Sequence, residues 1–490
     1  MDQSRLDQQA IIVIGGGISG LAAVNRLIEL QPERMPITLL DAAPRVGGII
    51  ATARHEGFLI EAGPDSFITH KPAGIELCRR LGLTGQLIQT NGAFRRTFIV
   101  RAGKLVPAPD GFQLLAPTNW KAFIKSPLFT WRGKARMALD LLIPRGRGAG
   151  DESLGSFVRR RFGREALERA AQPLVSGIYT ADPERLSLAA TMPRFLEMEQ
   201  RHRSIIRALR REAAAANSGG AGAAGVRYSL FVSFREGMQS LADALVARLP
   251  RGAVRCNLAV RAVRLGARGR WSIEIDDGQQ LEAGAVILAA PAFAIAQMLE
   301  GLDAELSREL AAIDYASAAT INLVYERDAI GHPLDGFGFV VPATERMTTL
   351  ACTFSSVKFA GRAPEGKVLL RAFVGGAMNP ESLELDDEGM VACVRGELQR
   401  LLDIRRAPWR AIVSRWPRSM PQYPVGHLEH VARIRARLAH HHGLFLAGNA
   451  YGGVGIPDCI SSGEAAAEAA LAWLTMRGMR SREAGKHAGT

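Results

Sequence analysis

The chain has 490 residues, of which 47% are hydrophobic and 22% are charged, so its composition is that of a globular protein and not of a disordered one. This length predicts two or three domains. The 61 lysines and arginines exceed the 48 acidic residues and give a formal net charge of +13. Such an excess attracts acidic lipid surfaces, nucleic acids or a polyanionic small molecule, but a solvated basic surface explains it equally well.

The cysteines and the apolar runs exclude several classes of protein. The five cysteines are scattered and never form a CxxC pair, so neither a disulfide framework nor a zinc site is indicated, and a reducing cytosol is expected. The first residues have no signal-peptide pattern. The longest apolar stretch, 285–299, contains Pro291 and is shorter than the roughly 20 residues that span a bilayer. We therefore expect a cytoplasmic protein without a transmembrane anchor.

The first predicted elements form a βαβ unit. An apolar strand at 11–14 leads into a glycine-rich turn and a helix, and a second strand at 37–40 ends at an aspartate. Glycines permit the tight turn and let backbone N–H groups approach a pyrophosphate at the helix N-terminus. The aspartate stands where a carboxylate accepts hydrogen bonds from a ribose 2′-OH. The predicted dinucleotide contacts are Gly15, Gly16, Gly17, Ile18, Ser19, Gly20 and Asp41.

A second glycine pair follows this unit. Gly47 and Gly48 come shortly after Arg45, which could neutralise the phosphates of an extended cofactor. Together with the segment 61–66, the pattern resembles the FAD-binding fingerprint of the flavoproteins that include amine oxidases and phytoene desaturases. This resemblance adds further predicted cofactor contacts, namely Gly63, Pro64, Asp65 and Ser66, although Asp65 also suits an Asx-type turn.

The segment 115–225 has a helical texture. Helices are predicted at 131–142, 153–162 and 192–211, followed by a small-residue loop at 213–222. Four aromatic residues alternate with cations here, which suits either a membrane surface or packing inside a helical subdomain. The aromatic residues are Trp120, Phe123, Phe129 and Trp131, and the cations are Lys121, Lys125, Arg132 and Lys134.

Strands return in the second half of the chain. They are predicted at 254–263, 271–275, 285–289, 321–325, 337–341 and 368–374. The chain closes with a strand at 444–447, a glycine-rich loop and a helix at 456–476. The partial positive charge of that helix N-terminus would stabilise negative charge on a reduced flavin.

Five segments, in order along the chain, resemble the protoporphyrinogen oxidase family. They are 173–187, 199–205, 336–342, 420–423 and 455–460, and the similarity extends from about residue 10 to 475. The family is oxygen-dependent, contains FAD and belongs to the amine-oxidase-like flavoproteins. The resemblance implies an α/β fold with a Rossmann-like FAD-binding domain, an α+β substrate domain and a helical, membrane-facing subdomain. It also implies six-electron oxidation of protoporphyrinogen IX in haem biosynthesis.

The resemblance also assigns individual residues. It places Val260 at the adenine side of the cofactor. Near the flavin it places Trp416, Val454, Gly455 and Ile456, and in the substrate pocket it places Arg96, Gly177, Val340, Thr353 and Phe373. In the family pattern Thr97 lies as close as Arg96 to the propionate-binding arginine. Thr353 replaces a more usual aliphatic residue.

No side chain is predicted to act as a general base, because aromatisation drives the reaction and the substrate mainly has to be positioned. No metal site is predicted either.

The domain division that follows is discontinuous. Residues 1–90, 226–300 and 415–490 would form the FAD-binding domain, 91–114 and 301–414 the substrate domain, and 115–225 the helical subdomain. Expected partners are a porphyrinogen, molecular oxygen, a membrane surface at the inner face of the cell membrane and a second copy of the chain, but no nucleic acid. Two alternatives stay open: oxidation of coproporphyrinogen III, and a flavin-binding partner protein without activity.

Overall fold

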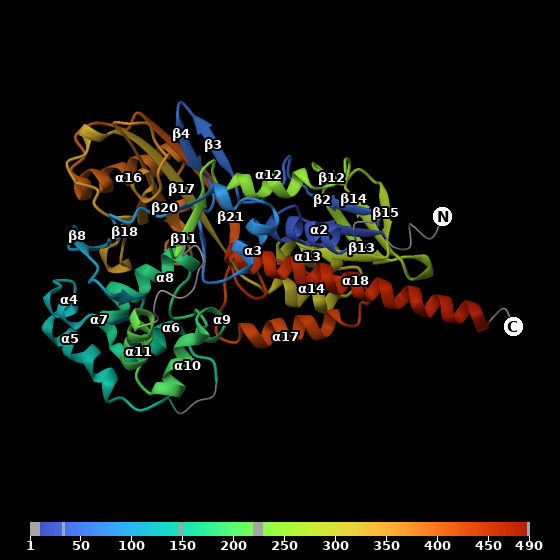
Figure 1. Cartoon of the computed structure of the whole chain (residues 1–490), viewed down its shortest axis with the longest axis horizontal. Coiled ribbons are helices and arrows are strands. Elements are labelled where there is room, and N and C mark those ends of the chain that lie inside the picture. The colour runs from blue at the N-terminus through green and yellow to red at the C-terminus, as the bar shows by residue number, and fades with distance from the viewer. Residues whose placement is uncertain (1–9, 32–34, 147–149, 219–228, 488–490) are drawn as a thin grey trace.

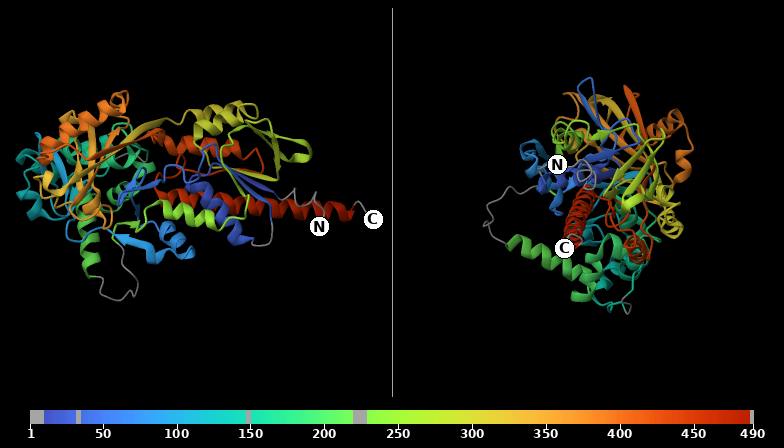
Figure 2. Two further views of the ribbon diagram at one scale, coloured as in Figure 1. Left: turned by 90° about the horizontal axis from the view of Figure 1, so that it is seen from above. Right: turned by 90° about the vertical axis from the view of Figure 1, so that its right-hand side faces the viewer.

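The computed structural model describes residues 10–31, 35–146, 150–218 and 229–487. It has an α/β architecture with two large sheets at opposite ends of an elongated molecule (Figure 1). A group of helices lies beside the sheet that is on the left in this view, and the long C-terminal helix runs along the other sheet (Figure 2). The predicted α/β fold class with a separate group of helices is therefore confirmed, whereas the membrane-facing role of those helices stays a prediction.

The first sheet has five parallel strands, and the predicted βαβ unit forms part of it. Ile11 pairs with both Ile37 and Ala285, so the all-apolar first strand is central, as expected for a strand that is buried on both faces. In spatial order the strands are β12 (Val254–Arg255), β2 (Ile37–Leu40), β1 (Ile11–Ile14), β16 (Ala285–Leu288) and β22 (Leu444–Leu446).

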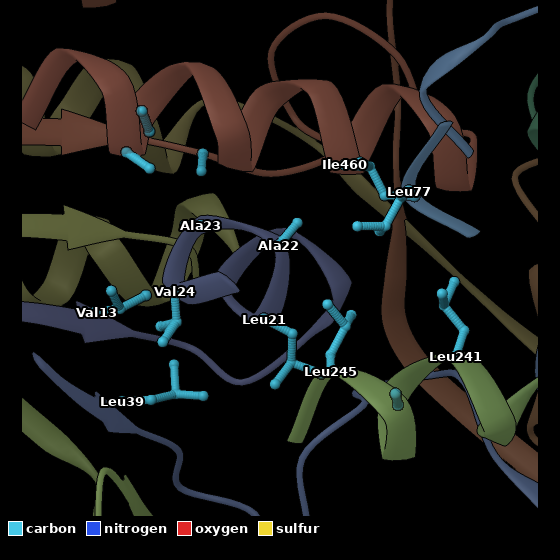
Figure 3. Close-up of a cluster of buried hydrophobic side chains, with 14 of the residues drawn as sticks. Val13, Leu21, Ala22, Ala23, Val24, Leu39, Leu77, Leu241, Leu245 and Ile460 are labelled. Atoms are coloured by element: carbon cyan, nitrogen blue, oxygen red, sulfur yellow. The ribbon is translucent and has the colours of Figure 1, made fainter. Parts of the chain in front are cut away.

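Two layers cover this sheet. One face packs against α2 (Ile18–Leu30), α3 (Ala73–Arg80), α12 (Gln239–Ala247) and α18 (Ile456–His487). Figure 3 shows this core, in which Val13 and Leu39 of the sheet meet Leu21, Leu245 and Ile460 of the helices. The other face packs against α13 (Ala292–Leu299), α14 (Ala304–Ala311), α17 (His427–Leu438) and a small sheet of β13 (Val260–Leu265), β14 (Trp271–Ile275) and β15 (Gln280–Ala283). The strand predicted at 254–263 is thus two strands, because the chain leaves the parallel sheet at Asn257, which has a φ of 57°.

The second sheet has seven strands. In spatial order they are β21 (Arg410–Pro421), β17 (Tyr315–Glu326), β20 (Lys367–Gly375), β19 (Thr349–Phe354), β18 (Gly338–Val340), β7 (Thr97–Arg101) and β8 (Lys104–Pro107). Helix α16 (Asp387–Leu402) buries Met390, Val394 and Leu398 against one face. The opposite face bonds to the segment that begins at Glu61: Thr320 donates to the Ala62 carbonyl at 2.9 Å, and Asn322 donates to the Glu61 carbonyl at 3.3 Å.

The helical region extends from α4 to α11. Its helices are α4 (Trp120–Lys125), α5 (Trp131–Ala138), α6 (Leu154–Phe162), α7 (Arg164–Ala166), α8 (Gln172–Tyr179), α9 (Leu188–Thr191), α10 (Pro193–His202) and α11 (Ile205–Ser218). The helix predicted at 192–211 is divided at Arg203, which has a φ of 64°. Residues 213–218 continue α11 and are not a loop, whereas residues 219–222 of that prediction lie outside the described residues.

Of the four aromatic residues that suited either a membrane surface or packing inside a helical subdomain, three belong to the core of this region. Phe123 and Phe129 are 0% and 3% exposed, and Trp120 packs against the same core. Only Trp131 of the four is largely exposed, at 71%. The apolar side chains that do reach the surface nearby are Ile124, Leu139 and Leu142. A helix packs its apolar stripe against the core, and in this region Phe123 and Phe129 belong to that stripe. The aliphatic residues Ile124, Leu139 and Leu142 lie on the exposed side.

The smaller strands connect these layers. They are β3 (Thr52–His55), β4 (Phe58–Glu61), β5 (Phe67–Ile68), β6 (Leu87–Gln89), β9 (Phe112–Gln113), β10 (Ala116–Pro117) and β11 (Phe231–Phe234). Leu306 and Leu310 of α14 belong to the same hydrophobic core as α13, α17 and the five-stranded sheet. The predicted domain boundaries stay a prediction. Among the described residues, no helix is both long enough and apolar enough to span a membrane.

Candidate functional site

The predicted dinucleotide loop connects β1 to α2. A Cβ atom on Gly20 would lie 1.9 Å from the Gly15 carbonyl oxygen, so only glycine fits at this turn. A Cβ atom on Gly17 would meet nothing within 4 Å, which leaves open space in front of the helix N-terminus. That N-terminus offers free N–H groups and partial positive charge to an anion. Ile18 and Ser19 begin the helix, and Ser19 is buried.

Asp41 lies directly after β2 and beside this loop. Its carboxylate accepts the N–H of Gly16 at 2.5 Å and that of Ala43 at 2.7 Å. The Leu258 N–H bonds to the Asp41 carbonyl at 3.0 Å, and this contact brings the start of β13, with Val260, to the same side. Asp41 and Val260 therefore lie together, as the prediction of a ribose and adenine side requires.

The second glycine pair lies against the first. The Gly47 N–H donates to the Gly16 carbonyl at 2.7 Å, and a Cβ atom on Gly48 would lie 3.3 Å from the Gly17 Cα. The exposed Arg45 donates from its guanidinium to the carbonyls of Val46, Gly48 and Ile50 at 2.9–3.0 Å. Arg45 thus shapes this loop, and its contact with cofactor phosphates stays a prediction.

The segment 61–66 continues from the glycine pair toward the seven-stranded sheet. A Cβ atom on Gly63 would lie 1.7 Å from the Ile49 carbonyl oxygen, so the backbone segments at Gly63 and Ile49 are in direct contact and leave no room for a side chain at Gly63. Beyond Pro64, the Asp65 carboxylate accepts two hydrogen bonds from Lys358 at 2.9 and 3.0 Å and one from Ser66 at 2.7 Å. The segment that carries the predicted contacts Gly63 and Ser66 is therefore fixed at two points, by the packing of Gly63 against Ile49 and by the hydrogen bonds of Asp65 with Lys358 and Ser66.

Charged groups around this segment are buried. Burial opposes the ionisation of Asp65, but Lys358 and then Arg371 outweigh it and hold the pKa of this carboxyl well below its usual range. Burial raises the pKa of Glu61, although hydrogen bonds from Thr52 and the Met238 N–H partly offset the effect. Trp416 of β21 donates from its indole nitrogen to the Ala62 carbonyl at 2.8 Å, which brings this predicted flavin contact to the same segment.

The C-terminal glycine loop lies between β22 and α18. The buried Tyr423 hydroxyl accepts the Gly453 N–H at 2.9 Å and donates to the Asn449 carbonyl, so it holds the loop that carries Val454. Asp458, in the first turn of α18, accepts the Gly455 N–H at 3.3 Å and pairs with Lys71 at 2.7 Å. Ile456 begins the helix, and burial raises the pKa of the nearby Cys459 thiol to about 12. Cys459 is therefore a core thiol.

Three predicted substrate residues share one face of the seven-stranded sheet. Val340 pairs with Ala351, and Ala351 pairs with Phe373, so these side chains form one row across three strands. Thr353 lies two residues beyond Ala351 and points to the same face. This is the face to which the segment 61–66 bonds, because Thr320, the partner of Phe373 on β17, donates to the Ala62 carbonyl.

The row of Val340 and Phe373, together with Thr353 on the same face, is called the substrate wall. Gly177 of α8 borders this wall from the side of the helical region. A Cβ atom at Gly177 would lie 4.0 Å from the Val340 Cγ1, and its neighbour Ile178 is 48% exposed although it is apolar. Gly177 is in the last turn of α8, where helix carbonyls have no partner further along the helix. Its carbonyl is therefore available to a donor, as its predicted role requires.

Arg96 lies differently from the other predicted substrate residues. It is 59% exposed and pairs with Asp335 at 3.0 Å. The strand register places its neighbour Thr97 opposite Gly338, in the row that continues to Thr353. Thr97 is therefore the residue of this pair that shares the face of the wall, whereas propionate binding by Arg96 stays a prediction.

Sequence reasoning missed three residues of the site. Tyr423 and Ile178 lie in segments that resemble the family but were assigned no role, and Arg371 was not identified. Alternation along the strand could have found Arg371, because it precedes Phe373 by two residues. The hydroxyl contacts of Tyr423 depend on a loop 26–30 residues away and leave no local signal.

The residues fit an extended dinucleotide cofactor. The open space at Gly17 would accept the pyrophosphate and Asp41 would accept the ribose, and both contacts stay predictions. The backbone path through Gly48 and Gly63 leads toward the seven-stranded sheet. A nicotinamide dinucleotide would not require the second half of this path. Among the described residues, no group of three histidine, cysteine or acidic side chains is arranged to hold a metal ion.

Comparisons with known proteins agree with this geometry. The family described as flavin containing amine oxidoreductase matches residues 18–471. A coproporphyrinogen III oxidase of Bacillus subtilis is 36% identical and covers 95% of this chain and 98% of its own. A protoporphyrinogen oxidase of Homo sapiens is 32% identical and covers 94% and 98%, respectively. The crystal structure of a candidate protoporphyrinogen oxidase from Exiguobacterium is 31% identical, superimposes with a TM-score of 0.83, and covers 94% of this chain and 98% of its own.

Proposed function

The chain belongs to the family of flavin containing amine oxidoreductases, and from this premise we propose that it is an FAD-dependent porphyrinogen oxidase of haem biosynthesis. The observation that carries the proposal is that the predicted substrate wall and the predicted cofactor segment meet on one face of the seven-stranded sheet. A bound flavin supplies reversible two-electron chemistry.

The wall suits a flat, apolar macrocycle. Val340 and Phe373 offer apolar surface, and Ile178 adds an exposed apolar side chain from α8. Because none of these side chains has an ionisable group, their role is to position the macrocycle against the cofactor and not to transfer protons. The Gly177 carbonyl accepts hydrogen bonds from the pyrrole N–H groups. Positioning of this kind supplies a large part of a rate enhancement without a general base.

The reaction balances as three two-electron steps. A porphyrinogen loses six electrons and six protons to become a porphyrin, and with oxygen as acceptor three O2 become three H2O2. Oxygen as the acceptor is part of the proposal.

Two porphyrinogens are candidates. Coproporphyrinogen III is favoured by the relative from Bacillus subtilis, which at 36% identity is more similar than the human protoporphyrinogen oxidase at 32%. Protoporphyrinogen IX, which the sequence analysis placed first, is the second candidate on the strength of the human relative. Coproporphyrinogen III carries two propionates more than protoporphyrinogen IX, so its binding requires more cations around the macrocycle.

Aerobic turnover of the purified yellow protein on both porphyrinogens, followed by porphyrin fluorescence, tests the proposal. Faster oxidation of coproporphyrinogen III, or of protoporphyrinogen IX, would identify the substrate. Consumption of three O2 per porphyrin would support oxygen as the acceptor. A protein that binds FAD but oxidises neither compound would contradict the proposal and favour a partner protein without activity.

We also propose that the protein is cytoplasmic and touches an acidic membrane surface through the patch of Ile124, Trp131, Leu139 and Leu142. These side chains are 46–71% exposed, and basic residues such as Lys125 and Arg132 lie between them in the sequence. Apolar side chains flanked by cations suit the interface of an anionic bilayer. A homodimer stays a prediction.

A further inference from the structure

Arg371 is a buried cation at the junction of the substrate wall and the cofactor segment. It is 3% exposed, and the strand register places it opposite Thr353 and two residues before Phe373, on the same face of the sheet. Its guanidinium lies 4.7 Å from the centre of the Phe373 ring. From its other side it donates to the Gly63 carbonyl.

Both partners of this guanidinium belong to the predicted site. Gly63 passes so close to Ile49 that the segment cannot move independently of the glycine pair at 47–48. Phe373 is the central aromatic residue of the wall. The carboxylate beside Arg371, Asp65, is already bonded to Lys358 and Ser66, and the Arg371 Nε has no hydrogen-bond partner among the described residues.

We propose that Arg371 is a positioning residue that couples the substrate wall to the cofactor segment. Its plane holds the Phe373 ring by a cation–π contact, and its donor edge holds the Gly63 carbonyl, so the ring and the cofactor segment keep one fixed separation. The substrate half of this inference rests on the proposed function; the cofactor half rests on the Gly63 contact.

The chain offers a matched control in Arg362. This arginine is also buried, at 2% exposed, donates to the Ser233 hydroxyl at 2.8 Å and the Phe234 carbonyl at 2.9 Å, and lies 5.6 Å from the Phe359 ring. It therefore has the same kinds of contact as Arg371, but none of these partners is a predicted cofactor or substrate contact. Ser233 in turn donates to the Asp65 backbone carbonyl at 2.7 Å, so Arg362 reaches the cofactor segment only through a second residue. Loss of Arg362 therefore measures the cost of removing a buried arginine that makes no direct contact with the predicted site.

The test compares Arg371→Met, Arg371→Lys and Arg362→Met in the full chain. FAD affinity is measured by flavin fluorescence on adding FAD to the apoprotein, KM and kcat by porphyrin fluorescence, and the unfolding temperature by circular dichroism. We expect Arg371→Met to raise KM roughly five- to thirtyfold, the range between an exposed and a desolvated cation–π contact, and to weaken FAD binding. We expect Arg371→Lys to restore FAD affinity, because an ammonium still reaches a carbonyl, but not KM, because it lacks the guanidinium plane.

A double variant locates the effect on KM. If Arg371 acts through Phe373, Arg371→Met adds less than twofold to KM when Phe373→Leu is already present. Arg362→Met is expected to lower the unfolding temperature while KM and FAD affinity stay within twofold of the wild type.

The inference is overturned if Arg371→Met and Arg362→Met lower the unfolding temperature alike and neither changes KM or FAD affinity. It is also overturned if Arg371→Lys has the KM and the FAD affinity of the wild type, because a positive charge without the guanidinium plane would then be enough for both. Should Arg371→Met not fold, the Lys variant decides on the same criteria. If the wild type oxidises neither porphyrinogen, the proposed function fails, whereas the FAD titrations still decide the cofactor half.

Discussion

At the residue scale, buried charges join the cofactor segment to the seven-stranded sheet. Asp65 is held between Lys358 and Arg371, and together these outweigh the burial that opposes its ionisation. Breaking such a pair leaves cations buried without a counter-ion, which costs more than the pair itself contributes. The contacts of Asp65 therefore matter for stability as well as for the shape of the site.

Asp65→Asn is expected to lower the free energy of unfolding at pH 7 by on the order of 3 kcal/mol. The folded-state pKa of Asp65 lies below its unfolded value near 3.9, so its contribution is present above that value and is lost as pH falls through the folded-state pKa. The gap between wild type and variant in urea unfolding should therefore narrow below about pH 4. A gap that stays constant from pH 7 to pH 3 would show that Asp65 is not ionised by its neighbours.

Tyr423→Phe removes a single hydroxyl that holds the glycine loop at two points. We expect FAD to bind up to about tenfold more weakly and the protein to lose roughly 1 kcal/mol of stability, the worth of such hydrogen bonds. The matched control is Tyr451→Phe, because the buried Tyr451 hydroxyl has no partner among the described residues. Equal FAD affinities of the two variants in a flavin fluorescence titration would mean that Tyr423 does not hold the loop for the cofactor.

At the element scale, two glycines of the site differ in what surrounds them. A methyl group at Gly63 would collide with the Ile49 carbonyl, whereas at Gly177, inside α8, it would only touch Val340. Alanine also favours a helix over glycine by roughly 0.5–1 kcal/mol. Glycine is thus required at position 63 by the backbone packing of the fold, whereas at position 177 a side chain would only reduce the space in front of the substrate wall.

Gly177→Ala is expected to fold with an unchanged or higher unfolding temperature but to raise KM for the porphyrinogen severalfold, because the methyl group enters the substrate space. Gly63→Ala is expected to lose both FAD and stability. Thermal unfolding and steady-state kinetics of the two variants separate these effects. A Gly177→Ala enzyme with wild-type KM would place the macrocycle elsewhere.

The elements themselves were largely predictable, and their contacts were not. The apolar run at 11–14, the glycines and Asp41 identify the βαβ unit because their spacing is local. The shared face of Val340 and Phe373 depends on a register across three strands with an irregularity at Leu350, which no local pattern encodes. The same reason separates Arg96 from Thr97, since one residue of register moves a side chain to the other face.

At the scale of the whole molecule, the proposed membrane contact depends on which side chains of the helical region reach the surface. The alternation of aromatic and basic residues in the sequence could not tell which side chains point outward, and Phe123 and Phe129 proved to be core residues. The exposed patch consists of Ile124, Trp131, Leu139 and Leu142 instead. Lys134 lies 4.5 Å from the Trp131 ring and helps to orient it.

A Trp131→Ser/Leu142→Ser variant is expected to lose most of its binding to anionic vesicles in a flotation assay while keeping its turnover in detergent. Each of these side chains contributes roughly 1.5–3 kcal/mol when fully buried in an apolar phase. Leu265→Ser is the control, because Leu265 is 59% exposed on β13, far along the chain from the patch. Equal flotation of all three proteins would exclude the patch as a membrane contact.

The most direct test of the account is an anaerobic mixing experiment with the purified FAD-loaded protein. Coproporphyrinogen III or protoporphyrinogen IX is added without oxygen, and the visible absorbance of the cofactor is followed together with the porphyrin band. The account predicts that the flavin absorbance falls when porphyrinogen is added and returns when oxygen is admitted, with porphyrin accumulating. A flavin spectrum that stays unchanged with both porphyrinogens would contradict the assignment of this site to porphyrinogen oxidation.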